Sequence, residues 1–474
     1  MRLLRKAGKE DGHLGKGLLI RSIALLMEMK LPLSVANIIR KLEEHGHEAY
    51  AVGGCVRDCF LGKVPKDWDI TTSARPEEVK EIFPKTIDTG IQHGTVTVMI
   101  DHVGYEVTTY RLDGVYKDGR HPEQVTFTPS LLEDLKRRDF TINAMAYNPS
   151  TGLVDAFDGQ KDLADGLIRC VGDPERRFSE DALRMMRAIR FAARFDFRIE
   201  EETYRAIRDL APTLSKVSME RIRDEFEKTI TSDHPERIRD FYETGLLSVF
   251  LPEWKAMEET EQHTVHHCYN VAGHTIEVMR NIPGKDYLRL AALLHDVDKP
   301  ACERIDQAGV SHFDGHPAMG AVDAGKILKR LRYDNETIKR VVNLIRWHDE
   351  RPKLKDKKIR LLISRVTKEA FPDLLLLKRA DTLGQSTYKR EEKLAYIDRL
   401  EEAFHQILER EDPLSVKDLK VTGKDLLKLG IPQGKAVGQV LRELLNLVLG
   451  DPALNEREKL LEIAARWMEK DTSF

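Results

Sequence analysis

The sequence predicts a multidomain protein with a mixed α/β domain toward its N-terminus and an all-α remainder. At 474 residues the chain is too long for one hydrophobic core, so about three or four domains are expected. Short runs rich in β-branched residues lie within 49–110. From Pro174 onward, apolar residues recur at the i, i+3, i+4 spacing of amphipathic helices.

The individual elements follow from local patterns. Residues 34–172 should form the α/β domain. Ser34 is in position to cap a first helix, whose apolar residues share one face, and Gly46 is in position to end it. The expected strands are 49–52, 69–72, 95–100 and 105–110. The helical remainder is expected to begin with helices at 178–197, 200–214, 218–232 and 236–242.

Composition limits the classes of function. The net charge is −3, so no overall positive field favours nucleic acid, and RNA binding would depend on local basic patches. The five cysteines include no C-x-x-C pair and are expected to be reduced thiols. The most apolar early stretch, 18–27, is interrupted by Arg21 and is far shorter than the roughly 20 apolar residues of a membrane span. We therefore expect a soluble, cytoplasmic protein that does not associate with membranes.

The most informative segment is the pair Gly53-Gly54, followed by Arg57 and then by Asp67 and Asp69. The sequence favours a strand, a turn and a helix start here, and glycines let a backbone approach phosphate oxygens. Two carboxylates one residue apart on a strand project to the same face and can hold a divalent cation. This combination is typical of metal-assisted nucleotidyl transfer. A glycine turn beside two solvated aspartates is the structural alternative.

Four segments carry a resemblance to a known family: 52–58, 66–70, 105–111 and 133–146. They resemble the head of the class II tRNA nucleotidyltransferases, the CCA-adding enzymes, and of their relatives, the bacterial poly(A) polymerases. The resemblance implies a polymerase-β-like mixed sheet in a nucleotidyltransferase head, followed by an all-α neck, body and tail. The implied division is an N-terminal extension at 1–33, the head at 34–172, the neck at 173–245, a helical domain of the histidine–aspartate (HD) type at 246–385 and the tail at 386–474.

The same resemblance implies a magnesium-dependent active site in the head. Asp67 and Asp69 would hold Mg²⁺, and Glu106 would add a third carboxylate from a neighbouring strand. A solvated strand face is the alternative for Glu106. Gly54 and Arg57 match the family's triphosphate contacts. The resemblance further implies that Arg138 contacts the nucleotide, that Arg137 contacts the RNA backbone, and that Asp139 and Asn143 hold the sugar.

The segment 178–190 predicts how a base is chosen. Asp181 and Arg184 are three residues apart on an expected helix and are therefore neighbours on its surface. A carboxylate accepts from an amino group and a guanidinium donates to a ring nitrogen or carbonyl oxygen, so this pair can read both cytosine and adenine. The segment resembles the family's E-D-x-x-R motif, with Glu180 as the orienting partner. Arg187 and Arg190 suit the nucleotide, its phosphates or RNA, and the alternative is a surface helix with ion pairs.

Two further segments resemble family features. The glycine-rich, charged stretch 111–122 resembles the loop that CCA-adding enzymes use when they switch from C to A, which argues against an enzyme that adds only C. In the tail, Gly434 and Gly438 would open a helix whose N-terminus, helped by Lys435, takes an RNA phosphate, and a plain helix cap is the alternative. The resemblance implies that the tail binds the elbow of a tRNA by shape and phosphates.

Histidines and aspartates of the second half have the order and spacing of an HD-type metal phosphohydrolase: His274, His295, Asp296 and Asp381. Their nitrogen and oxygen atoms suit a divalent Mn, Ni, Fe or Mg ion. A second metal or substrate contacts could come from His312, His316 and His348. Some relatives with such a domain hydrolyse phosphate esters, and the alternatives are structural histidines or a retained scaffold.

The sequence as a whole predicts a CCA-adding enzyme that extends tRNA 3′ ends from CTP and ATP without a nucleic-acid template. Two alternatives within the superfamily are a poly(A) polymerase, whose basic G-R-R-F-type stretch is absent here, and the A-adding partner of a split system. A hydrolase whose head only holds RNA is the alternative from another class. A pure RNA-binding module fits least, because paired carboxylates repel phosphates when no cation lies between them. The expected partners are tRNA, CTP and ATP, with no obligate protein partner.

Overall fold

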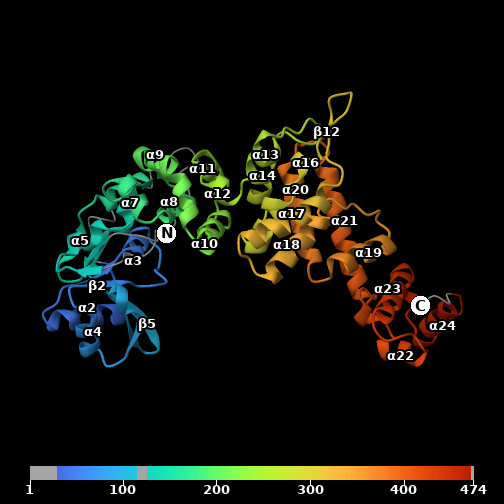
Figure 1. Cartoon of the computed structure of the whole chain (residues 1–474), viewed down its shortest axis with the longest axis horizontal. Helices are drawn as coiled ribbons and strands as arrows, with labels where there is room; N and C mark the ends of the chain where they lie inside the picture. Colours follow the sequence, from blue (N-terminus) through green and yellow to red (C-terminus); the bar gives the residue numbers. More distant parts are fainter. Residues whose placement is uncertain (1–28, 115–124, 471–474) are drawn as a thin grey trace, which may run out of the picture. The chain divides into compact units, whose positions relative to one another are not determined.

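The computed structural model describes residues 29–114 and 125–470. The chain forms two compact units, the first ending at Pro252 and the second beginning at Glu253. Figure 1 draws the elements of each unit. Most of the expected extension at 1–33 and the greater part of the expected loop at 111–122 lie outside the described residues. No described helix is long and apolar enough to cross a membrane.

The first unit contains a seven-stranded sheet with the strand order β3-β4-β5-β2-β1-β8-β9. Strands β2 and β5 run parallel, whereas all other neighbours in this sheet are antiparallel. The mixed sheet expected for the head is therefore confirmed. The strands are β1 (Ala49–Val52), β2 (Ile70–Thr72), β3 (Thr86–Gly90), β4 (Thr95–Ile100), β5 (Val103–Thr109), β8 (Met145–Asn148) and β9 (Gly152–Asp155). A separate antiparallel pair consists of β6 (Arg111–Asp113) and β7 (Val125–Phe127).

Short helices accompany the sheet, and the first shows how its sequence forms it. The helices are α2 (Leu33–Glu44), α3 (Gly54–Phe60), α4 (Pro76–Ile82), α5 (Leu131–Lys136) and α6 (Gly159–Asp165). The apolar stripe of α2 is buried, and Gly46, with a φ of +86°, follows its end as predicted. The prediction that Ser34 caps this helix is wrong. Pro32 occupies the N-cap position, and Ser34 lies inside the first turn.

Two strands have the predicted bounds and a third differs in a way that matters for the site. Strands β1 and β4 match the prediction, whereas β2 begins at Ile70. Asp69 therefore directly precedes the strand, although its carbonyl still accepts a hydrogen bond of 3.0 Å from the Val52 N–H. Asp67 lies in the bend before it.

The end of the first unit is helical, as predicted, with one break. The elements are α7 (Pro174–Glu180), α8 (Leu183–Phe195), α9 (Glu201–Leu210), α10 (Met219–Ile230), α11 (Ile238–Glu243), α12 (Leu247–Phe250) and the short parallel strands β10 (Leu167–Ile168) and β11 (Arg198–Ile199). The predicted single helix at 178–197 is two helices that separate at Asp181. The Asp181 carboxylate accepts from the Leu183 N–H at 3.0 Å and so caps the start of α8.

The second unit is helical apart from one small hairpin, β12 (Arg304–Ile305) and β13 (Ser311–His312). Its helices are α13 (Trp254–Glu259), α14 (Val271–Asn281), α15 (Asp286–Leu294), α16 (Lys299–Cys302), α17 (His316–Arg330), α18 (Asn335–Trp347), α19 (Asp356–Val366), α20 (Phe371–Gly384), α21 (Arg390–Glu409), α22 (Gly423–Lys428), α23 (Lys435–Gly450) and α24 (Arg457–Lys470). Helices α14 and α20 pack together closely. Buried Arg360 of α19 binds the Leu449 carbonyl and Asp412, which ties the last helices to the rest of this unit.

Candidate functional site

The glycine turn of the first unit has the predicted strand–turn–helix geometry. Strand β1 leads into Gly53, whose φ of +79° is in the left-handed region, and helix α3 begins at Gly54. A Cβ atom on Gly53 would lie 2.9 Å from Nη1 of Arg138. The backbone conformation thus favours glycine at this position, and a side chain here would displace the guanidinium of Arg138.

Three carboxylates lie together at the edge of β2 and β5. The parallel register pairs Ile70 with Val107, which places Glu106 beside the residue that precedes β2, Asp69. Partial burial, then the charges of Asp69 and Asp67, raise the pKa of Glu106. Partial burial also raises the pKa of Asp69, with Asp67 adding to the effect and Arg138 opposing it. Each carboxylate therefore experiences the negative charge of the others.

This carboxylate group has the donor chemistry that Mg²⁺ prefers. Carboxylate oxygens are its usual protein ligands, and a cation between Asp67, Asp69 and Glu106 would relieve their mutual repulsion. All three residues nevertheless keep part of their surface open to solvent. Within 29–114 and 125–470, sets of three ligand atoms that all lie within 4.8 Å of one another occur only in the second unit. The oxygens of the head would therefore have to draw closer around an ion.

Arg138 lies between the glycine turn and the carboxylates. It and Arg137 share the fully buried Asp134, with Arg137 Nη2 at 2.7 Å and Arg138 Nη2 at 3.3 Å from its oxygens. Burial opposes ionisation of Asp134, but the two arginines outweigh it and lower its pKa. The buried Nε of Arg138 has no hydrogen-bond partner. Arg138 is thus fixed at one side and keeps an unused donor.

A buried polar chain connects α3 to α8. Arg57, which is 4% exposed, donates to Asp58 and to the side-chain oxygen of Asn143. The Asn143 amide donates to Asp139 at 3.0 Å, and Arg187 donates to the same carboxylate at 2.8 and 2.6 Å. These residues therefore bind one another in this structure. Their predicted contacts with triphosphate, sugar or RNA stay predictions. The same holds for Arg190 of α8, which pairs with Glu225 at 2.7 Å.

The two predicted base-reading residues do not share one helix. Asp181 lies at the junction of α7 and α8, and Arg184 lies in the first turn of α8. The sequence pattern could not reveal this, because the apolar spacing continues across the junction. The second oxygen of Asp181 pairs with Nη2 of Arg221 on α10 at 3.1 Å. Sequence reasoning did not single out Arg221.

Arg184 is held by acceptors on three sides. Its Nη1 donates to Glu180 at 3.0 Å, as the orienting role predicted for Glu180 requires, and to the Arg177 carbonyl at 3.3 Å. Its Nη2 donates to the carbonyl of Arg137 at 3.0 Å. This last bond connects the base-reading segment to the residue beside Arg138.

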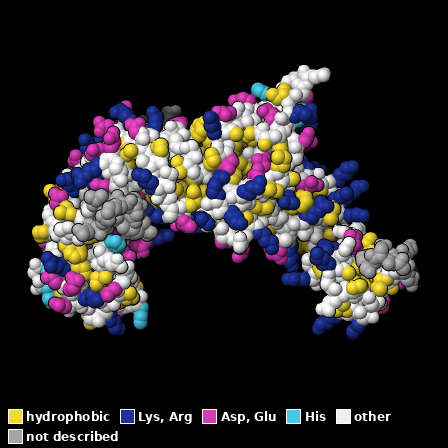
Figure 2. All heavy atoms as spheres, viewed as in Figure 1, with side chains coloured by type: hydrophobic (Ala, Val, Ile, Leu, Met, Phe, Trp, Pro, Cys, Tyr) yellow, Lys and Arg dark blue, Asp and Glu magenta, His cyan; other side chains and the backbone are white. Residues whose placement is uncertain are grey.

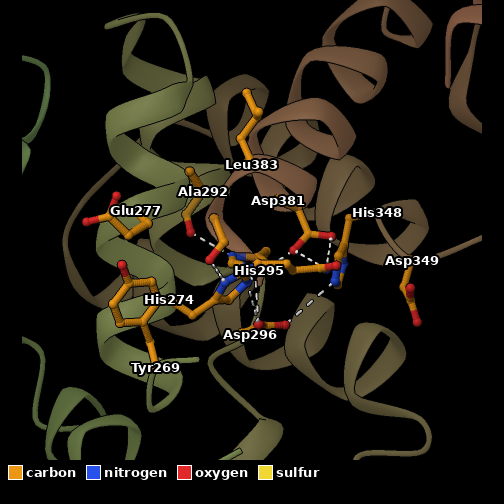
Figure 3. Close-up of polar contacts among 12 residues, drawn as sticks. Tyr269, His274, Glu277, Ala292, His295, Asp296, His348, Asp349, Asp381 and Leu383 are labelled. Atoms are coloured by element: carbon orange, nitrogen blue, oxygen red, sulfur yellow. Dashed lines mark hydrogen bonds and ion pairs between the residues drawn. The ribbon is translucent and has the colours of Figure 1, made fainter. Parts of the chain in front are cut away.

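A second site, in the other unit, gathers four histidines around Asp296. Figure 3 shows His274, His295 and His348 pointing toward Asp296 and Asp381. Nε2 of His295 and of His274 lie 3.1 and 3.5 Å from Oδ2 of Asp296. Nε2 of His316 and of His348 lie 3.3 and 3.7 Å from its Oδ1. Asp296 is therefore common to two sets of possible ligand atoms: His274, His295 and Asp296, and Asp296, His316 and His348.

The ring orientations of these histidines suit metal binding. Each Nδ1 faces a backbone carbonyl that can only accept, so Nδ1 carries the proton and, in the neutral ring, Nε2 presents a lone pair. The carbonyls belong to Gly384 for His274, Ala292 for His295, Phe313 for His316 and Ile345 for His348, at 3.2, 2.8, 2.7 and 2.7 Å. All four lone pairs are thereby directed at the centre of the cluster.

Asp296 has the features of a carboxylate that holds a cation. It is 1% exposed, and its oxygens face the Nε2 atoms of the four histidines and the ammonium group of Lys299. Burial opposes its ionisation, but His295 and Lys299 hold its pKa well below the usual range. Lys299 lies at 2.7 Å from Oδ2 and also donates to Gln262 at 2.8 Å. The residues present therefore fit a divalent ion.

Asp381 completes one side of the cluster, since its Oδ1 lies 3.1 Å from Nε2 of His274. A cavity of about 260 Å³ opens beside the cluster and is also lined by the cationic side chains Lys299, Arg351 and Lys393. Of the further predicted histidines, His316 and His348 join the cluster, whereas His312 pairs with Asp306 at 2.8 Å. Lys299 was missed, although its position three residues after Asp296 was the available signal.

Models of known protein families match three segments of the chain. Residues 49–169 match the family model described as the poly A polymerase head domain. Residues 196–258 match the model "Probable RNA and SrmB- binding site of polymerase A", and residues 317–464 match tRNA nucleotidyltransferase domain 2. The chain is a nucleotidyltransferase with the head and the following RNA-binding segment of that class.

Curated relatives narrow the class to one family. The CCA-adding enzyme of Ligilactobacillus salivarius is 35% identical over 446 residues, covering 91% of this chain and 96% of that protein. That of Enterococcus faecalis is 36% identical over 440 residues, covering 92% and 96%. The chain belongs to the CCA-adding enzyme family of tRNA nucleotidyltransferases. The match to the enzyme of Leuconostoc mesenteroides is 58% identical over 193 residues but spans only 48% of that protein.

Solved structures agree on the fold. The Bacillus stearothermophilus CCA-adding enzyme in complex with CTP has a TM-score of 0.68 and 28% identity, over 93% of this chain and 99% of that one. The Thermotoga maritima CCA-adding enzyme, solved with tRNA, shares the fold with a TM-score of 0.57 and 23% identity, over 95% and 98%. The stretch 259–316, which contains His274 and His295, lies between the second and third matched family segments.

Proposed function

We propose that this protein adds C, C and A to the 3′ end of tRNA, taking CTP and ATP as substrates and using no nucleic-acid template. One observation carries the proposal. The base-reading candidate Arg184 donates to the carbonyl of Arg137, next to Arg138, which borders both the glycine turn and Asp69. A nucleotide whose base meets Arg184 thus has its phosphates near the residues that suit them.

The proposed chemistry assigns each group one task. Asp67 and Asp69, with Glu106, would hold Mg²⁺, which lowers the pKa of the RNA 3′-hydroxyl and neutralises the triphosphate. The hydroxyl gives its proton to solvent and its oxygen forms a bond to the α-phosphorus, while the bond from the α-phosphorus to the bridging oxygen breaks and pyrophosphate leaves. Gly54 lets the backbone approach the phosphates, while Arg138 offers them positive charge.

Base choice follows from hydrogen-bond polarity. Asp181 accepts from the exocyclic amino group that cytosine and adenine share, and Arg184 donates to the neighbouring acceptor. A good bidentate contact of this kind discriminates by roughly 1–3 kcal/mol. Uracil and guanine present a carbonyl oxygen where Asp181 requires a donor.

We also propose that the neck, residues 173–245, and the tail, residues 386–474, bind the tRNA. Exposed lysines accompany the tail helices: Lys417, Lys420, Lys424, Lys428 and Lys435. Figure 2 shows many Lys and Arg side chains on this face of the helices α22 to α24. Such side chains pair with phosphates irrespective of sequence, which suits a partner recognised by its shape.

A substrate panel tests the proposal against its relatives. The protein is incubated with tRNA lacking its CCA end, tRNA ending in CC and an unstructured RNA, each with CTP or ATP alone. We expect C on the first substrate, one A on the second and nothing on the third. Failure to incorporate C would refute CCA addition. A alone on the CC end would indicate an A-adding enzyme, and runs of A on the unstructured RNA a poly(A) polymerase.

A second function is supported by the buried carboxylate of Asp296, which lies among four histidines. We infer that the histidine cluster holds one or two divalent ions, among Mn, Ni, Fe and Mg, and serves hydrolysis of phosphate esters, with Lys299, Arg351 and Lys393 available to the phosphate. Asp296→Ala should abolish metal retention, measured by mass spectrometry, and phosphate release, while CCA addition persists. Asp69→Ala should do the reverse. Retained metal in the Asp296→Ala protein would exclude this site.

A further inference from the structure

The carboxylate of Asp181, which is predicted to read the base, is bound by a residue of helix α10. Oδ1 of Asp181 accepts the Leu183 N–H at 3.0 Å, and Oδ2 pairs with the Arg221 guanidinium at 3.1 Å. The side chains of Asp181 and Arg221 are only 16% and 22% exposed. One oxygen is thus fixed by the backbone of α8 and the other by a side chain of α10.

Helix α10 is itself well anchored against α8. Four residues after Arg221 on α10, Glu225 pairs with Arg190 of α8 at 2.7 Å, so the two ion pairs lie one helical turn apart on the same face. The side chains of Ile222 and Phe226 on α10 are buried. The Arg221 guanidinium therefore approaches Asp181 from a rigid support.

This arrangement has a chemical consequence for base choice. A carboxylate has about four lone-pair directions, so two remain for a ligand after Leu183 and Arg221 have bound. The carboxylate oxygens left open accept and cannot donate, and the bonds to Leu183 and Arg221 fix the directions in which they point. An amino group can then bind them, whereas the carbonyl oxygen of uracil or guanine finds no donor there.

We propose that Arg221 is a specificity-determining positioning residue, which orients the acceptor oxygens of Asp181 so that C and A are chosen over U and G. The proposal rests on the proposed CCA addition. It predicts that Arg221 acts on the ratio of correct to incorrect nucleotide more than on catalysis itself, because Arg221 works through Asp181.

The experiment measures kcat and KM for CTP and for UTP on tRNA lacking its CCA end. In Arg221→Gln we expect the ratio of kcat/KM for CTP to that for UTP to fall by roughly tenfold or more, mainly through KM for CTP. Arg221→Lys, which keeps the charge but not the fork, should give an intermediate ratio. The control Arg223→Gln, on the same helix and paired with exposed Asp224, should keep the wild-type ratio.

A double-mutant cycle separates positioning from general stability. In an Asp181→Ala background, Arg221→Gln should change the ratio no further. Equal falls for CTP and UTP, or a full effect without Asp181, would overturn the proposal. Should Arg221→Gln not fold, the Lys variant decides, and an unchanged ratio there overturns it too. A wild-type protein that incorporates no C would instead refute CCA addition itself.

Discussion

At the scale of single residues, Gly53 is where backbone and side-chain requirements coincide. Its φ of +79° disfavours any side chain, and a Cβ would meet Arg138 at 2.9 Å. In Gly53→Ala the flexible guanidinium would shift, so we expect kcat/KM for CTP to fall by roughly tenfold, corresponding to about 1.4 kcal/mol. Steady-state CCA addition measures this.

Gly62 supplies the matched control. Its φ is +68°, and nothing lies within 4 Å of a Cβ built there. Gly62→Ala should lose about as much stability as Gly53→Ala, on the order of 1–2 kcal/mol, without the loss of activity. Equal activity of the two variants would show that the contact with Arg138 is unimportant.

Asp139 couples the stability of the first unit to pH. Burial alone would raise its pKa, but Arg187 and Asn143 lower the pKa of Asp139 below its usual range. Such a group contributes stability above its unfolded pKa of about 3.9, and this is lost as the pH falls through the folded value. Between about pH 5 and pH 3, wild-type protein should thus lose more unfolding free energy than Arg187→Met.

Urea unfolding at several pH values tests this difference. Arg205→Met is the control, because Arg205 pairs with exposed Glu201 on α9 and its replacement should leave the wild-type pH dependence unchanged. Parallel loss of stability in wild type and Arg187→Met would contradict a role for the Arg187–Asp139 pair.

At the scale of elements, the close approach of α14 and α20 depends on Gly384. A Cβ there would lie 3.0 Å from Cγ2 of Val278 and 3.3 Å from Nδ1 of His274, whose proton the Gly384 carbonyl accepts. Gly384→Ala should therefore disturb the His274 ring and weaken Mn²⁺ binding by roughly 10–100-fold, measured by titration calorimetry. Gly325→Ala in α17, with 3.4 Å to Val342, should bind normally.

Local pattern explains which elements could be predicted. Strands β1 and β4 have the predicted bounds because alternating apolar or β-branched residues mark a strand locally, without information from the rest of the chain. The break between α7 and α8 could not be foreseen, because the side chain of Asp181 ends one helix and caps the next while the apolar spacing continues. The sequence therefore indicated Asp181 and Arg184 as the base-reading pair, but it did not predict the helix junction that positions Asp181.

Long-range packing explains what the sequence left open in the sites. The order of His274, His295, Asp296 and Asp381 indicated a cluster, yet His312 and His316 could not be told apart, since only the fold decides that His312 meets Asp306 instead. Arg221 carried no local signal either. Its partner lies forty residues earlier in the chain, and their contact depends on how α8 and α10 pack.

At the scale of the whole molecule, the two units should respond to different ligands. Each has its own buried core, so we expect separate calorimetric transitions. CTP with Mg²⁺ should stabilise the first unit and Mn²⁺ the second. At a hundredfold excess over Kd, each ligand should raise the unfolding free energy of its unit by about 2.7 kcal/mol. Asp296→Ala should remove only the Mn²⁺ response. A single transition raised by both ligands would contradict this independence.

The ammonium group of Lys299 affects how the histidine cluster can bind and release a divalent ion. Lys299 already lies 2.7 Å from Asp296, so the polypeptide carries its own counter-ion. Emptying the pocket then leaves no bare anion in the interior, the situation that makes many buried charges intolerable. Loading and release can proceed without unfolding. Occupancy would then follow the free ion concentration of the surroundings from moment to moment, independent of how each molecule first folded.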